Sequence, residues 1–195
     1  NCLGSFSPLR SQAHEVRTHG SGVGDKVGQL LISAENIRAA GFFLNPQQVL
    51  GSTIIAAILH QHGLSFTSKI NEERARDIFT QSTLVQKIVE QMRAHFQARF
   101  LAVRSSAYGD ARGTGIYQSR YCKNTPEDAL RAVVDVLASY FSEDGDHFRR
   151  RAHKAPGFAV SMEKLLGRPI ESRHQQHEDY YAPILSGYAY TDSTD

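Results

Sequence analysis

The chain has 195 residues, with 22 Lys and Arg against 20 Asp and Glu, a formal net charge of +2, and 41% hydrophobic residues. This composition is typical of one folded domain or two small ones, and it argues against wholesale disorder. A nucleic-acid-binding protein would carry a basic excess on one face, and a bilayer crossing would need roughly 20 consecutive apolar residues. We therefore expect no nucleic acid and no membrane among its partners.

The cysteine content indicates the cellular compartment, and the first residue indicates how the chain was produced. The two cysteines, Cys2 and Cys122, are too few for a disulfide scaffold, which favours a reducing, cytoplasmic location. The first residue is Asn rather than Met, so we expect an excised or processed piece of a longer protein.

The basic run 149–154 follows an acidic run and is expected to be a solvated helix face, with polyanion contact as the alternative.

The first half of the chain is predicted to be mainly helical, because apolar residues recur at spacings of three and four. Residues 1–20 lack periodicity and are expected to be an irregular lead-in to one domain over 21–195. The predicted elements of this half are helices over 24–39, 54–61 and 71–95, the last broken into two near 80–82, and a short strand over 49–53.

The second half alternates strands and helices. Residues 98–104 are rich in apolar and β-branched residues and predict a buried strand that ends in the charge of Arg104. Strands are also predicted over 117–122, 158–166 and 184–191, helices over 125–140 and 143–153, a loop over 105–115 and a polar connector over 168–179. This order predicts an α+β fold with a mostly antiparallel sheet flanked by helices.

The most informative segment is Arg104 with Ser105 and the glycine-rich stretch that contains Gly113 and Gly115. A glycine-rich loop lets backbone N–H groups approach an anion, and a guanidinium can bind phosphate oxygens bidentately. The segment therefore predicts a nucleotide phosphate site. The alternative is a plain hairpin loop, with Arg104 paired to an acid. The segment matches neither a Walker P-loop nor a G-x-G-x-x-G turn that opens a helix.

The run 103–107, with Asp110, Gly115-x-Tyr117-x-Ser119 and Asn124, resembles the ATP-covering segment of the phosphoenolpyruvate synthase and pyruvate phosphate dikinase family. Three other blocks, 24–31, 158–167 and 186–191, resemble family segments in the same order. The resemblance implies an ATP-grasp nucleotide-binding domain, here incomplete. In the parent enzyme such a domain would pass a phosphoryl group from ATP to a histidine on a separate phosphohistidine domain.

The resemblance also implies roles for individual residues. Lys26 and Arg104 correspond to the family's phosphate-binding cations, which would stabilise the transferring phosphoryl group in catalysis. Ser105, Gly113 and Gly115 fall in the ATP-covering segment, and Glu163 stands near the adenine, where the family has glutamine. Read from the residues alone, Lys26 could be a plain surface lysine, although its charge would slightly oppose the dipole at a helix start. Glu163 could be a solvated glutamate on a strand edge.

Three departures from the family pattern bear on activity. Asp25 replaces a family glycine and could weaken the pull of Lys26 on phosphate, Gly113-Thr114 replaces Phe-Ala, and Glu163 replaces glutamine. The chain also ends before the acidic residues that hold magnesium in the family, so Mg²⁺ is expected only in the complete enzyme and the fragment alone is expected to be inactive. The alternative is a non-catalytic module that senses nucleotide or binds a partner.

No metal site is expected within the chain itself. The spacings His60-x-His62 and His174-x-x-His177 could suit a metal, but the sequence places no companion ligands beside them. Solvated loop histidines are the simpler interpretation.

Overall fold

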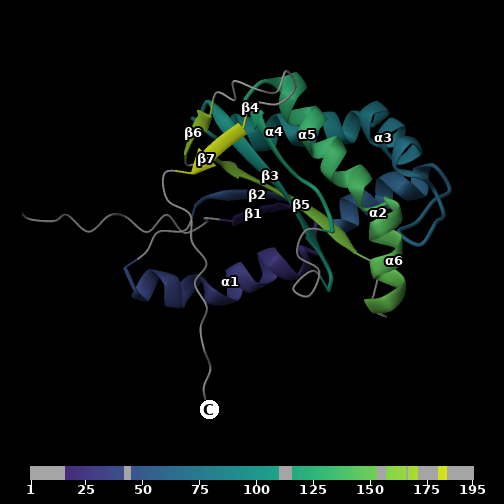
Figure 1. Ribbon diagram of the computed structural model, residues 1–195, viewed down its shortest axis with the longest axis horizontal. Helices are drawn as coiled ribbons and strands as arrows, with labels where there is room; N and C mark the ends of the chain where they lie inside the picture. Colours follow the sequence, from purple (N-terminus) through teal and green to yellow (C-terminus); the bar gives the residue numbers. More distant parts are fainter. Residues whose placement is uncertain are drawn as a thin grey trace, which may run out of the picture.

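A five-stranded sheet with helices on both faces forms the centre of the described structure (Figure 1). The computed structural model describes residues 16–41, 45–109, 116–152, 157–165, 167–170 and 180–183. The strands of this sheet, in the spatial order β1-β2-β5-β3-β4, are β1 (Val16–His19), β2 (Gln47–Leu50), β3 (Phe100–Ala107), β4 (Ser119–Lys123) and β5 (Phe158–Lys164). The helices are α1 (Gly24–Ala39), α2 (Ser52–Gln61), α3 (Glu72–Gln81), α4 (Thr83–Ala94), α5 (Pro126–Ser139) and α6 (Glu143–Ala152). A second, two-stranded sheet pairs β6 (Gly167–Ile170) with β7 (Tyr180–Pro183). The predicted α+β class is confirmed.

The five-stranded sheet is mixed, so the prediction of a mostly antiparallel sheet is wrong. β1 and β2 run in parallel, with Val16 opposite Gln47, while the other neighbouring strands pair antiparallel. α1 joins β1 to β2, and a helical crossover of this kind returns the chain in the same direction. The predicted lead-in over 1–20 is also corrected at 16–19, where β1 is too short for its alternation to be read from sequence.

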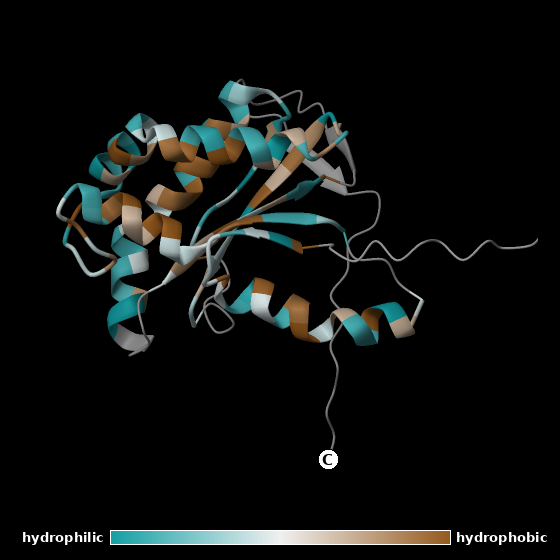
Figure 2. Ribbon diagram, turned by 180° about the vertical axis from the view of Figure 1, so that it is seen from behind, coloured by the Kyte–Doolittle hydropathy of each residue, from teal (hydrophilic) through white to brown (hydrophobic). Residues whose placement is uncertain are grey.

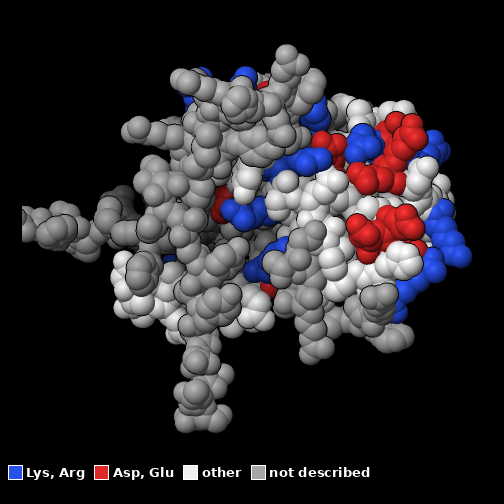
Figure 3. Space-filling view, viewed as in Figure 1, with Lys and Arg blue, Asp and Glu red and all other residues white. Residues whose placement is uncertain are grey.

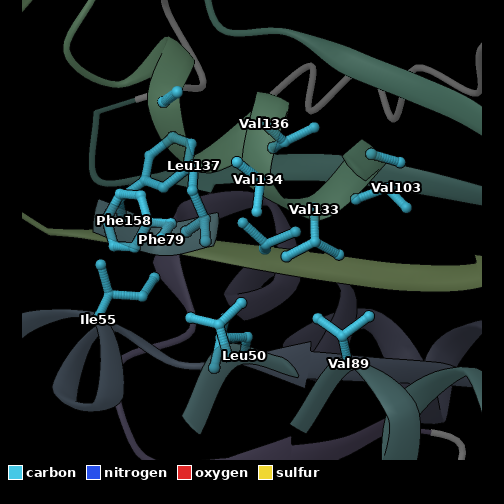
Figure 4. Close-up of a cluster of buried hydrophobic side chains, with 14 of the residues drawn as sticks. Leu50, Ile55, Phe79, Val89, Val103, Val133, Val134, Val136, Leu137 and Phe158 are labelled. Carbon is cyan, nitrogen blue, oxygen red and sulfur yellow. The ribbon is translucent and has the colours of Figure 1, made fainter. Parts of the chain in front are cut away.

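The larger hydrophobic core fills the space between one face of the sheet and helices α2 to α5. Alternate residues of β3 and β5 point into it, including Val103 and Phe158, which are fully buried (Figure 4). The Phe158 ring lies 5.1 Å from the ring of the buried Tyr140. Burying a side chain of this size stabilises the fold by about 1.5 to 3 kcal/mol. This face of the sheet therefore carries most of the apolar packing.

α1 covers the opposite face of the sheet only in part. Figure 2, which views the molecule from behind, shows α1 on the far side of the sheet from the other helices. Among the described residues, the cluster of buried apolar side chains on this side is small, and consists of Val27 of α1, Val49 of β2 and Ala159 of β5. Because strand side chains alternate between faces, Arg104 and Glu163 lie on this same side. The α1 face thus changes from apolar to charged along β3 and β5.

Side-chain caps define the helix starts that the sequence predicts. Ser82 ends α3 and begins α4, where its Oγ accepts a hydrogen bond from the Val85 N–H at 3.3 Å. Thr125 caps α5 by accepting from the Asp128 N–H at 3.2 Å, and Pro126 follows in the first turn. Such oxygens satisfy N–H groups that the helix itself leaves without partners. The predicted break near 80–82 and the predicted cap at Thr125 are both confirmed.

Other strand boundaries differ from the prediction. β3 continues through the first residues of the predicted loop, because Ser105 pairs with Val160 and Ala107 with Phe158 across the sheet. Arg104 therefore lies within the strand and does not end it. β6 occupies the start of the predicted polar connector over 168–179, and the predicted strand over 184–191 lies outside the described residues.

Arg149 and Arg150 of α6 are both paired with an acid of their own helix. Arg149 and Arg150 contact the Asp146 carboxylate at 3.4 and 2.5 Å, and the Arg149 guanidinium lies 4.1 Å above the centre of the Tyr140 ring. A hydrogen bond from Arg150 lowers the pKa of Asp146. Arg150 is 61% exposed, as the solvated-face interpretation expects, whereas Arg149 is only 20% exposed. None of the described helices combines the length and apolar composition needed to cross a bilayer.

Burial of the Cys122 thiol should make it a slow nucleophile in the folded state. Desolvation raises its pKa to about 12 from an ordinary value of 9.0, which lowers the thiolate fraction about a thousandfold. In a Cys2→Ser variant, Cys122 should react with a disulfide reagent at pH 8 far more slowly in buffer than in guanidinium chloride. The reaction is followed by absorbance. Equal rates in the two solvents would contradict this burial.

Candidate functional site

A glycine-rich turn joins β1 to the start of α1. Gly20, Gly22 and Gly24 have φ angles of +81°, +79° and +72°, in the left-handed region that glycine tolerates. At Gly24 the reason is also steric, because a Cβ there would lie 1.9 Å from the Ser106 carbonyl oxygen. Only glycine allows the backbone of α1 to approach β3 this closely.

The first turn of α1 is tethered to the end of β3 by hydrogen bonds. The Ser106 hydroxyl donates to the Val23 carbonyl at 2.7 Å and accepts from the Val27 N–H at 3.2 Å. The Asp25 carboxylate accepts from the Gly109 N–H at 2.7 Å. The helix start is therefore held at a defined place on the sheet.

The other side of the glycine-rich turn is held by α2. The Ser52 N–H donates to the Gly22 carbonyl at 2.8 Å, and the Thr53 N–H donates to the Ser21 carbonyl at 3.1 Å. The Thr53 hydroxyl in turn accepts from the Ser21 N–H at 2.9 Å. Since the turn is fastened on both sides, its backbone is preorganised.

The two predicted phosphate-binding cations lie on one side of the sheet. Lys26 is an exposed residue in the first turn of α1. Arg104 is two residues before Ser106 in β3, on the same face and about 7 Å away along the strand. In Figure 3, Lys and Arg side chains lie across the centre of the visible face, with Asp and Glu beside them.

Arg104 is paired with Glu163, as the alternative of an acid partner anticipates. The Arg104 Nε donates to Glu163 Oε1 at 2.7 Å, and the two side chains are 48% and 12% exposed. The other carboxylate oxygen, Oε2, accepts from the side-chain amides of Asn45 and Gln47, each at 3.2 Å. The prediction that Glu163 could be a solvated strand-edge residue is wrong, because it lies in a central strand and is paired and largely buried.

Of the other predicted site residues, Ser105 does not share a face of the sheet with Arg104. Ser105 is 1% exposed, and strand alternation turns it to the face opposite Arg104. Its hydroxyl has no hydrogen-bond partner in the described part of the chain. Gly113 and Gly115 lie outside the described residues.

Sequence reasoning missed several residues that build this region. The turn 20–24 has the pattern Gly-x-Gly-x-Gly directly before a helix, which is a signal that could have identified it. Ser106 was indistinguishable from Ser105 until the register of β3 was known. Asn45 and Gln47 carry no motif at all, since they reach Glu163 only through the pairing of β2 with β5.

The described residues provide no metal site. No group of three or more His, Cys, Asp or Glu side chains in the described ranges is arranged to hold an ion. His60 and His62 belong to the end of α2 and the residue that follows it, while His174 and His177 lie outside those ranges. The structure therefore supplies no support for magnesium binding by this part of the chain.

Gly24→Ala tests the close approach of α1 to β3. The added methyl group would meet the Ser106 carbonyl, and the positive φ disfavours alanine, so we expect a loss of more than about 2 kcal/mol in the free energy of unfolding. The matched control is Gly28→Ala, where nothing lies within 4 Å of the added Cβ and the helical position favours alanine. Urea denaturation measures both variants. Equal stabilities would contradict the contact.

Comparison of the chain with models of known protein families gives no match, and comparison with curated proteins gives none either.

Proposed function

We propose that this chain binds the phosphates of a nucleoside triphosphate, ATP in the first instance, at the side of the sheet shared by α1 and Arg104. The observation that carries the proposal is the contact of Gly24 with Ser106, which puts a helix N-terminus, Lys26 and Arg104 on one side of the sheet. The N-terminus of a helix favours negative charge, because its first N–H groups and its dipole point outward.

Arg104 and Lys26 would contact phosphate oxygens in different ways. A guanidinium presents a planar set of N–H donors that matches two phosphate oxygens, whereas an ammonium acts as a flexible point charge. In a phosphotransferase resembling phosphoenolpyruvate synthase, both would stabilise charge on a phosphoryl group that passes from ATP to a histidine of a separate domain. Magnesium would neutralise phosphate charge in the complete enzyme.

A second candidate function is a non-catalytic nucleotide-sensing or partner-binding module of the same fold. Carboxylates stand next to the cations, with Glu163 paired to Arg104 and Asp25 adjacent to Lys26 in sequence. They reduce the positive potential offered to a triphosphate. The sequence of the parent gene separates the two functions, because an enzyme would add an acidic metal pair and a phosphoacceptor histidine.

Calorimetric titration of ATP tests the proposed binding. We expect a Kd of about 0.1 mM or weaker for the chain as given, because two cations face most of the triphosphate charge. Arg104→Ala and Lys26→Ala should each weaken binding at least about fivefold, since each removes a charged contact. Arg131→Ala, on the exposed side of α5, is the matched control and should leave the affinity unchanged. Wild-type affinity in both site variants would refute the proposal.

A second test uses the full-length parent protein. Arg104→Ala should slow ATP-dependent phosphorylation by on the order of 10² while the fold stays intact, because loss of a positioned cation removes charge stabilisation of the transferring group. Phosphoenzyme formation and thermal unfolding are measured together. Near-normal turnover would assign Arg104 a purely structural ion pair.

A further inference from the structure

The contact between Arg104 and Glu163 leaves a specific part of the guanidinium available. The Arg104 side chain uses Nε for this bond, and no other hydrogen bond joins it to a side chain or carbonyl of the described residues. Four of the five guanidinium N–H groups belong to the two terminal nitrogens, Nη1 and Nη2. The arginine side chain as a whole is 48% exposed, so we expect these nitrogens to be open to a ligand from the solvent side.

Glu163 is itself held in place by donors from the start of β2 and from the segment just before it. Asn45 Nδ2 and Gln47 Nε2 both donate to Oε2, and Asn45 Nδ2 also donates to the Lys164 carbonyl at 2.9 Å. Among the described residues, the carboxylate therefore accepts hydrogen bonds from the N–H groups of three side chains, those of Arg104, Asn45 and Gln47. Such a set fits a carboxylate, because both oxygens of an ionised carboxylate accept hydrogen bonds.

We propose that Glu163 is a positioning residue for anion binding, which holds Arg104 by Nε so that its two terminal nitrogens face a phosphate as a bidentate pair. This inference rests on the proposed function. An exposed arginine samples many rotamers, and fixing it before the ligand arrives removes that entropy from the cost of binding. The carboxylate thus strengthens anion binding although it carries the same charge sign as the ligand.

The proposal predicts that loss of Glu163 weakens anion binding, whereas simple electrostatics predicts that it strengthens it. Removing a negative charge beside a phosphate site should tighten anion binding if charge alone mattered. If Glu163 positions Arg104, Glu163→Ala should instead weaken binding of inorganic pyrophosphate about tenfold. Glu163→Gln retains an oxygen that can accept from Nε, so its affinity should fall between those of the wild type and Glu163→Ala.

A double-mutant cycle decides whether the effect runs through Arg104. Pyrophosphate is titrated by calorimetry into the chain as given, Glu163→Ala, Arg104→Ala and the double variant. On the Arg104→Ala background, loss of Glu163 should no longer weaken binding. Glu90→Ala is the matched control, because Glu90 pairs with Arg93 on α4, away from this face, and its loss should leave pyrophosphate affinity unchanged. Thermal unfolding of each variant verifies that it is folded at the titration temperature.

Each outcome bears on the inference. Tighter or unchanged binding in Glu163→Ala would overturn the positioning role and leave the proposed function standing, because Arg104 would still bind the anion. An equal loss on both backgrounds would also overturn it, since Glu163 would then act without Arg104. If the wild-type chain binds neither pyrophosphate nor ATP, the proposed function fails, and the positioning role fails with it.

Discussion

The approach of Gly24 to the Ser106 carbonyl is the constraint on which the candidate site depends. A methyl group at this position would lie 1.9 Å from that oxygen, so the contact exists only because residue 24 is glycine. It sets where α1 begins on the sheet, and it thereby brings Lys26 to the side of the sheet that carries Arg104. The crossover from β1 through α1 to β2 follows from the same placement and makes the sheet mixed.

One face of the sheet packs the hydrophobic core, and the other carries charged residues. Helices α2 to α5 bury one face in a continuous hydrophobic core, which supplies most of the packing that stabilises the fold. The other face is covered by α1 over a small apolar cluster and carries charge beyond it. A sheet anchored on one side can hold polar groups in fixed positions on the other, because the strand backbone is rigid.

The ion pair of Arg104 and Glu163 contributes little to stability, and it is the contact on which the anion binding proposed above depends. A half-exposed arginine contributes little net free energy through a salt bridge, whereas a carboxylate that is only 12% exposed has lost much of its hydration. The amides of Asn45 and Gln47 offset that loss by donating to the second carboxylate oxygen. The resulting array keeps a guanidinium fixed at the surface, which is a property that an anion-binding site requires.

The sequence by itself determined the local features of this protein. Apolar spacing located α1 and a break near 80–82 between α3 and α4, and Thr125 marked the start of α5, because helix formation and capping depend on residues a few positions apart. Only the tertiary structure decided the strands and the site. Glu163 meets Arg104 across 59 residues and Asn45 across 118. Strand length, register and the face that each side chain takes depend on partner strands distant in the chain, and local composition does not encode those partners.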